Sequence, residues 1–139
     1  MHSFETTISQ LRKEGFKLTP QRLAVIKFML GNRTHPSALA IHKDLKRKYR
    51  SLSFSTVYNT LNMLEKIGEV RPLHARDGHL NYDPNTENHL HFYCEKCDMI
   101  HDIMLDEQNI GVMIPEAEIS GHQIDSYQVI FRGTCRDCR

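Results

Sequence analysis

The chain has 139 residues, enough for one domain or two small ones, and a formal net charge of only +1 at pH 7. No apolar run approaches the ~20 residues of a membrane span, so we expect a soluble and cytoplasmic protein. The charge is uneven: residues 1–72 hold 13 Lys and Arg against 5 Asp and Glu (+8), and residues 73–139 hold 5 against 12 (−7). A basic N-terminal half is typical of nucleic-acid binders, because phosphate contacts supply the sequence-independent part of the affinity. A merely solvated basic surface is the alternative.

Two helices are expected first. Apolar residues recur at helical spacing in residues 4–14, and Gly15 follows as a stop signal. Thr19 and Pro20 suit the N-cap and first position of a second helix, which would end at Gly31. The apolar face of the second helix is expected to comprise Leu23, Val25, Ile26, Met29 and Leu30.

A third helix is expected after Ser37, and a fourth from Ser53 or Ser55 to Gly68. The third would bury Leu39, Ile41 and Leu45 and expose Lys43, Lys46, Arg47, Lys48 and Arg50. The fourth would direct Val57, Leu61 and Leu64 to the core, because they recur at i, i+4 and i+7. Its other side would carry Thr56, Tyr58, Asn59, Thr60 and Asn62.

That outer side carries hydroxyl, amide and aromatic groups in place of the usual Lys and Glu pairs. Asn can pair bidentately with adenine, and Tyr can contact a thymine methyl or a phosphate, so the composition suits a major-groove helix. An ordinary exposed helix is the alternative. The alternating runs Glu69–Leu73 and His79–Asp83, joined by turn residues 76–78, predict a hairpin. Helices followed by a hairpin predict a winged helix-turn-helix DNA-binding domain over residues 1–83.

Residues 84–88 are rich in turn formers and predict a hinge. Residues 89–139 would then form a small α/β domain of three strands and one helix, which makes the whole chain α+β. The strands are expected at 89–94, 99–105 and 127–133, and the helix at 106–119. A small sheet with exposed edges often gains stability by pairing across a dimer, so we expect a homodimerisation domain.

The chain has four cysteines, in two Cys-x-x-Cys pairs: Cys94, Cys97, Cys135 and Cys138. Two thiolates held two residues apart can reach one ion at about 2.3 Å, and two such turns close a tetrahedral zinc site. Two disulfides or idle thiols are the alternative. Because four thiolates leave no open position for a substrate, we expect one structural Zn²⁺ per subunit, joining the last strand to the third-last.

The first strand of this domain also carries alternating histidines. Successive side chains of a strand point to opposite faces, so His89 and His91 would share one face, with Leu90 and Phe92 on the other. Asp102 lies in the next expected strand, 99–105. His101 is its neighbour in that strand and would therefore point to the opposite face. The other histidines are expected to be ordinary surface or core residues: His2, His42, His74, His79, His101 and His122.

Five motifs in order carry a family resemblance. They are Thr19-Pro20-Gln21-Arg22, His35-Pro36-Ser37-Ala38, Ser55-Thr56-Val57-Tyr58-Asn59-Thr60-Leu61, the array Asp83 with His89-x-His91, and the paired Cys-x-x-Cys motifs. Together they resemble the ferric uptake regulator family over essentially the whole chain. The resemblance implies a metal-dependent dimeric repressor of a double-stranded DNA operator, and no enzyme. Candidate DNA-contacting residues are Arg22, Ser55, Thr56, Tyr58 and Asn59.

The resemblance also implies a regulatory metal site of three His and two Asp: His35, Asp83, His89, His91 and Asp102. Iron-uptake members tend to carry Glu at positions 83 and 102 and often Arg at position 59, so this chain is more similar to the peroxide-sensing members. In those, His35 and His89 are the residues implied to be oxidised. An iron-responsive or other metal-responsive uptake repressor is the alternative. Residues that hold a further metal in some members are replaced by Asn109 and Tyr127, so no third site is expected.

The ligand chemistry agrees with this interpretation, because a mixed imidazole and carboxylate set suits Fe²⁺ or Mn²⁺ rather than zinc or Cu(I). A zinc hydrolase or deaminase is disfavoured, since it needs an open zinc site and a Glu where the chain has His91. A non-haem iron oxygenase could use two of the His and one carboxylate, but no substrate pocket is visible in the sequence.

Overall fold

The computed structural model describes residues 1–104 and 118–139, which form two compact units, Met1–Thr86 and Glu87–Arg139. The boundary between the units falls inside the stretch 84–88, for which a hinge was predicted. The hinge itself stays a prediction. Among the described residues, no helix is long and apolar enough to cross a lipid bilayer.

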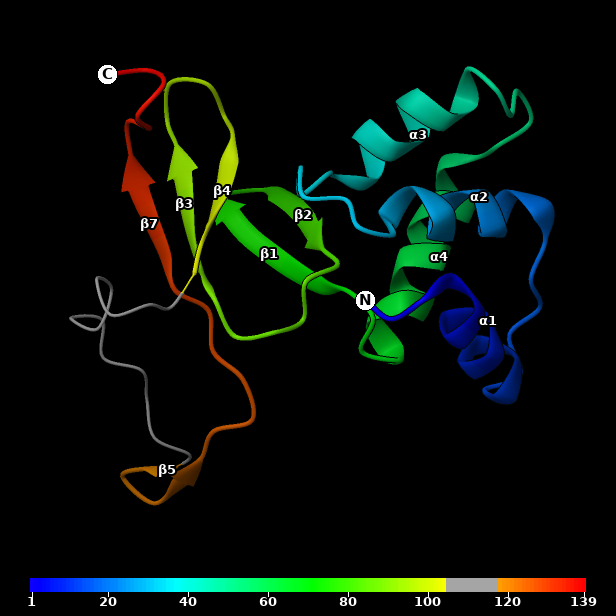
Figure 1. Ribbon diagram of the computed structural model, residues 1–139, viewed down its shortest axis with the longest axis horizontal. Helices are drawn as coiled ribbons and strands as arrows, with labels where there is room; N and C mark the ends of the chain where they lie inside the picture. The colour runs from blue at the N-terminus through cyan, green and yellow to red at the C-terminus, as the bar shows by residue number, and fades with distance from the viewer. Residues whose placement is uncertain (105–117) are drawn as a thin grey trace. The chain divides into compact units, whose positions relative to one another are not determined.

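The first unit contains four helices and a two-stranded hairpin (Figure 1). The helices are α1 (Phe4–Lys13), α2 (Pro20–Met29), α3 (Ala38–Lys46) and α4 (Phe54–Lys66), and the strands are β1 (Arg71–Arg76) and β2 (His79–Asp83). This is the arrangement of a winged helix-turn-helix, as predicted.

Each helix of this unit begins at a hydroxyl N-cap. The side-chain oxygen accepts a hydrogen bond from the N–H three residues later, which satisfies a donor that the helix itself cannot pair. The caps are Ser3, Thr19, Ser37 and Ser53, the last of these being one of the two starts predicted for α4.

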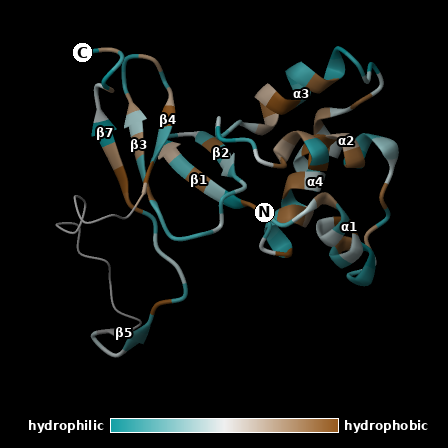
Figure 2. Ribbon diagram, in the orientation of Figure 1, coloured by the Kyte–Doolittle hydropathy of each residue, from teal (hydrophilic) through white to brown (hydrophobic). Residues whose placement is uncertain are grey.

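The core of the unit lies where α2, α3 and α4 pack on one another, and Figure 2 shows hydrophobic residues along these helices. Val57, Leu61 and Leu64 of α4 are completely buried, as predicted. From α2 the core receives Val25, Ile26 and Met29. Burial of each such side chain contributes roughly 1.5–3 kcal/mol relative to exposure.

Three residues differ from the predicted burial: two that were expected to be buried are exposed, and one that was expected to be exposed is buried. Leu39 is 67 % exposed, because α3 presents Ala38 and Ile41 to the core and position 39 is turned away from that stripe. Leu30 is the C-cap of α2 and is 38 % exposed, since the chain leaves helical geometry there. Thr60, expected on the outer face of α4, is buried, and its hydroxyl donates to the Thr56 carbonyl at 2.6 Å.

The hairpin is antiparallel, with Arg71 opposite Asp83 and Leu73 opposite Asn81. The first strand lies further along the chain than the predicted run 69–73: it begins at Arg71, the partner of Asp83, and continues past an irregularity in the register to Arg76, the partner of His79. The turn falls at Asp77-Gly78, as the turn residues indicated.

The second unit has a three-stranded sheet in the order β4-β3-β7. These strands are β3 (Leu90–Cys94), β4 (Ile100–Ile103) and β7 (Ile130–Gly133); β3 pairs antiparallel with β4 and parallel with β7. A small hairpin, β5 (Glu118–Ile119) with β6 (His122–Gln123), was not predicted. The helix expected at 106–119 lies outside the described residues except for its last two, and these form β5 instead.

Candidate metal centres and nucleic-acid interface

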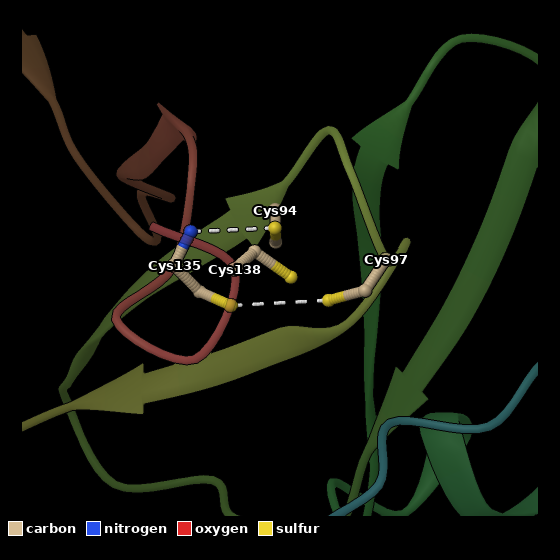
Figure 3. A group of neighbouring side chains, drawn as sticks. All are labelled: Cys94, Cys97, Cys135 and Cys138. Carbon is tan, nitrogen blue, oxygen red and sulfur yellow. Dashed lines mark hydrogen bonds between the residues drawn. The ribbon is translucent and has the colours of Figure 1, made fainter.

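The four cysteines converge in the second unit (Figure 3). Cys94 ends β3 and Cys97 lies in the following turn, while Cys135 and Cys138 follow β7. Because β3 and β7 are parallel neighbours, both Cys-x-x-Cys turns emerge at the same end of the sheet. The four Sγ atoms lie within 4.8 Å of one another, and none is in a disulfide.

Backbone hydrogen bonds hold both turns. The Asp98 N–H donates to the Cys94 carbonyl at 2.9 Å, with Asp98 at φ 59°, and the Cys138 N–H donates to the Cys135 carbonyl at 3.0 Å. The two turns are also linked, since the Cys135 N–H donates to Cys94 Sγ at 3.3 Å. The Lys96 ammonium donates to the Cys138 carbonyl at 3.0 Å. These bonds preform a cage of four soft donors.

The thiols of the cage differ in acidity. The N–H of Cys135 lowers the pKa of Cys94 to about 6. Hydrogen bonding with the thiols of Cys135 and Cys97 raises the pKa of Cys138 to about 12. At Cys97 the backbone N–H of Met99 lowers the pKa, but the Cys94 thiol and burial together raise it. Four thiols this close together cannot all lose their protons unless a dication offsets the repulsion between the thiolates. A closed tetrahedral set of four thiolates is typical of structural Zn²⁺.

The first unit brings together two of the predicted regulatory ligands. His35 and Asp83 are both buried, and His35 Nε2 lies 3.9 Å from Asp83 Oδ1. The loop before α3 holds His35 at φ 49°, and its carbonyl accepts from the Asn81 amide at 2.7 Å. Asp83 ends β2, where its Oδ1 accepts from the Asn85 N–H at 2.8 Å.

The second unit brings together the other three. The rings of His89 and His91 lie 4.4 Å apart between centroids, on one face as predicted. Asp102 Oδ1 lies 3.3 Å from His89 Nε2 and 3.7 Å from His91 Nε2, because Asp102 is the register partner of His91 on β4. His101 is the partner of Phe92 and so faces the other way. The Glu87 carbonyl, 2.8 Å from His89 Nδ1, orients that ring so that Nε2 meets the carboxylate.

The candidate DNA-contacting residues divide between two helices. Ser55, Thr56, Tyr58 and Asn59 lie on the exposed or half-exposed side of α4. Arg22 lies in the first turn of α2, and its guanidinium donates to the Lys17 carbonyl at 2.5 Å. Sequence reasoning overlooked Phe54, which is 46 % exposed and stacks on Tyr58. Its spacing of four residues from Tyr58 is the signal that could have found it.

A winged-helix unit, joined in one chain to a unit with a four-thiolate cage, defines a metal-dependent DNA-binding regulator. A profile of the ferric uptake regulator family matches residues 13–130. The chain belongs to the ferric uptake regulator family, and it is a transcriptional regulator rather than an enzyme.

Known relatives agree. The chain is 34 % identical to the peroxide-responsive repressor PerR of Staphylococcus epidermidis, over 99 % of this chain and 91 % of that protein. Among solved structures, PerR from Streptococcus pyogenes is 30 % identical and superposes with a TM-score of 0.56, covering 100 % of this chain and 95 % of that one. The ferric uptake regulator of Helicobacter pylori gives a TM-score of 0.75 at 23 % identity, covering 99 % and 94 %, which is a likeness of fold alone.

Members of this family are dimeric repressors that bind operator DNA, so a second copy of the chain and double-stranded DNA are its partners. Its cofactors are a structural Zn²⁺, which fits the four cysteines, and a regulatory Fe²⁺ or Mn²⁺, which fits the His and Asp ligands.

Proposed function

We propose that this regulator is a cytoplasmic repressor that senses peroxide through oxidation of histidines at its regulatory metal site. Support comes from its 34 % identity to a peroxide-responsive repressor over nearly the full length of both chains. The presence of Asp rather than Glu at positions 83 and 102 adds to that support.

The regulatory ion would take ligands from both units: His35 and Asp83 from the first, and His89, His91 and Asp102 from the second. The pairs inside each unit already have the required proximity, with His35 3.9 Å from Asp83 and His89 3.3 Å from Asp102. If one ion took ligands from both units, it would fix the angle between them, and therefore the spacing of two α4 helices in a dimer. Metal then acts as an allosteric ligand, because it binds the DNA-competent arrangement more tightly.

The oxidation step uses the ligand imidazoles themselves. The five proposed ligands would hold Fe²⁺, which would supply one-electron chemistry with peroxide beside the imidazoles. The iron would return to Fe²⁺, so the imidazole ring supplies both electrons that peroxide takes up. Overall, the C2–H of His35 or His89 becomes a C2 carbonyl, one peroxide oxygen enters the ring, and the other leaves as water. The oxidised ring is a poorer ligand, so the link between the units is lost and the protein leaves DNA. The four cysteines take no part, since zinc would occupy their sulfur atoms. Neither Cys94 nor Cys97 combines exposure with a lowered pKa: the pKa of Cys94 is lowered but its thiol is buried, and Cys97 is exposed but its pKa is raised.

The test compares the iron and manganese forms after equimolar peroxide. The iron form is expected to gain one oxygen on the peptide bearing His35 or His89 and to lose operator binding. The manganese form is the control and should keep its mass and its affinity, because Mn²⁺ does not reduce peroxide in this way. Mass spectrometry of proteolytic peptides and DNA mobility shifts measure the two results.

An iron form that keeps both histidines and its DNA affinity would contradict peroxide sensing. The chain would then be an iron-responsive repressor, for which metal supply itself is the signal. Titration of operator binding with Fe²⁺ in the absence of peroxide distinguishes that case.

A further inference from the structure

An exposed aromatic pair stands at the start of α4. Phe54 is the first residue of the helix and Tyr58 follows one turn later; their side chains are 46 % and 43 % exposed. The two rings stack with centroids 6.4 Å apart and planes inclined by 20°. Together they form one continuous apolar surface on the side of the helix that faces away from the core.

Neighbouring groups fix the Phe54 ring. The His42 ring of α3 meets it edge-on, at 6.1 Å between centroids and 88° between planes. His42 is itself anchored, with Nε2 2.8 Å from the Leu52 carbonyl in the loop before α4. Leu52 is buried, so the support reaches the core of the unit. Ordering of the ring therefore costs little further entropy when a partner binds.

Single exposed apolar residues are common on protein surfaces and need no special role. Phe54 differs because it shares its face with Ser55, Tyr58 and Asn59, all exposed. The last turn of the adjacent α3 carries Lys43 and Lys46. An apolar surface beside hydrogen-bonding groups, next to a helix that carries basic residues, matches the major groove, where the thymine C5-methyl is the apolar feature.

We propose that Phe54 contacts thymine methyl groups in the operator and is, with Tyr58, a residue that determines its sequence specificity. The inference rests on the proposed repressor function and deepens it. The N-terminal residues of a recognition helix are those that reach base edges, and Phe54 opens α4. The ring has no hydrogen-bonding group, so it selects thymine through apolar contact alone.

The test removes the methyl group from the DNA and the ring from the protein. A duplex is first selected from a random library with the manganese-loaded dimer, and each thymine is then replaced in turn by uracil. One uracil position per half-site is expected to weaken wild-type binding about fourfold, the effect of one buried methyl group. In Phe54→Ala that uracil effect should vanish. This variant should also bind the selected duplex about tenfold more weakly, with unchanged affinity for a random duplex.

Three further variants make the result specific. Leu30→Ala removes an exposed apolar side chain outside α4 and should keep the wild-type uracil profile. Phe54→Leu retains apolar contact and should retain part of the uracil effect, which also covers the case in which Phe54→Ala is poorly folded. Tyr58→Ala distinguishes the contribution of Phe54 from that of Tyr58. In this variant, uracil should still weaken binding at the thymine that Phe54 contacts.

An unchanged uracil profile in Phe54→Ala would overturn the inference. So would loss of the effect in Tyr58→Ala with retention in Phe54→Ala, since Phe54 would then only support its neighbour. Both results leave the repressor function intact. Failure of the wild-type dimer to select any duplex would instead overturn the repressor function, and this inference with it.

Discussion

Individual thiols in the four-cysteine cage hold their protons with different strength. The pKa of Cys94 is lowered to about 6, whereas that of Cys138 is raised to about 12 and that of Cys97 is also raised. At pH 7 these directions favour the thiolate form at Cys94 and the protonated form at Cys97 and Cys138.

Zinc binding at pH 7 is accordingly expected to release at least two protons, because every zinc-bound cysteine is a thiolate. The apparent affinity should rise as the pH rises through neutrality, since fewer protons then compete with the ion. Calorimetric titration of the metal-free protein with Zn²⁺, in buffers of different ionisation enthalpy, measures the protons released. Release of fewer than two would mean that Cys97 or Cys138 is already ionised.

Among single helices, the sequence was informative where structure depends on local chemistry. Caps at Thr19 and Ser37 could be predicted because a hydroxyl and the N–H three residues later are neighbours in the chain. The exposure of Leu39 could not be predicted from the sequence, because α3 has too few turns for its apolar residues to define a single buried stripe. The extent of β1 also depends on strand register, which is set by the partner strand.

At the scale of one element, the start of α4 depends on Ser53. Its Oγ accepts from the Thr56 N–H at 3.1 Å, so Ser53→Ala leaves that donor without its cap. We expect a loss of about 1 kcal/mol in the free energy of unfolding. Urea denaturation measures it.

The neighbouring Ser55→Ala is the matched control for this prediction, because Ser55 was the other candidate cap and lies exposed inside the helix. A surface substitution of this kind should change the free energy of unfolding by less than about 0.5 kcal/mol. If Ser55→Ala lowered the free energy of unfolding more than Ser53→Ala, the N-cap of α4 would be Ser55 rather than Ser53.

At the scale of the whole molecule, the sequence predicted which cysteines form the cage because their spacing is itself the constraint of the metal site. The regulatory ligands remain a prediction from the resemblance to the family, but strand alternation did place His89 and His91 on one face, where their rings lie together. The β5–β6 hairpin was not recognised, since its two-residue strands are too short to show alternation.

The zinc cage is expected to decide whether the second unit is folded. Its main sheet has three strands of only four or five residues, which can enclose little apolar core. The cage joins the turn after β3 to the segment after β7, so it closes that sheet. Structural zinc binding contributes roughly 10–16 kcal/mol in small domains, as much as the entire ~5–15 kcal/mol net stability of a typical domain.

Cys94→Ser and Cys138→Ser should therefore each lose the zinc and, with it, the stable dimer. Metal analysis combined with size-exclusion chromatography and thermal unfolding measures the three properties together. Asp102→Ala is the control, because it removes a proposed regulatory ligand from the same unit and should leave zinc content and dimer intact. A zinc-free dimer of native stability in either cysteine variant would contradict the structural role of the cage, since the sheet would then close without the ion.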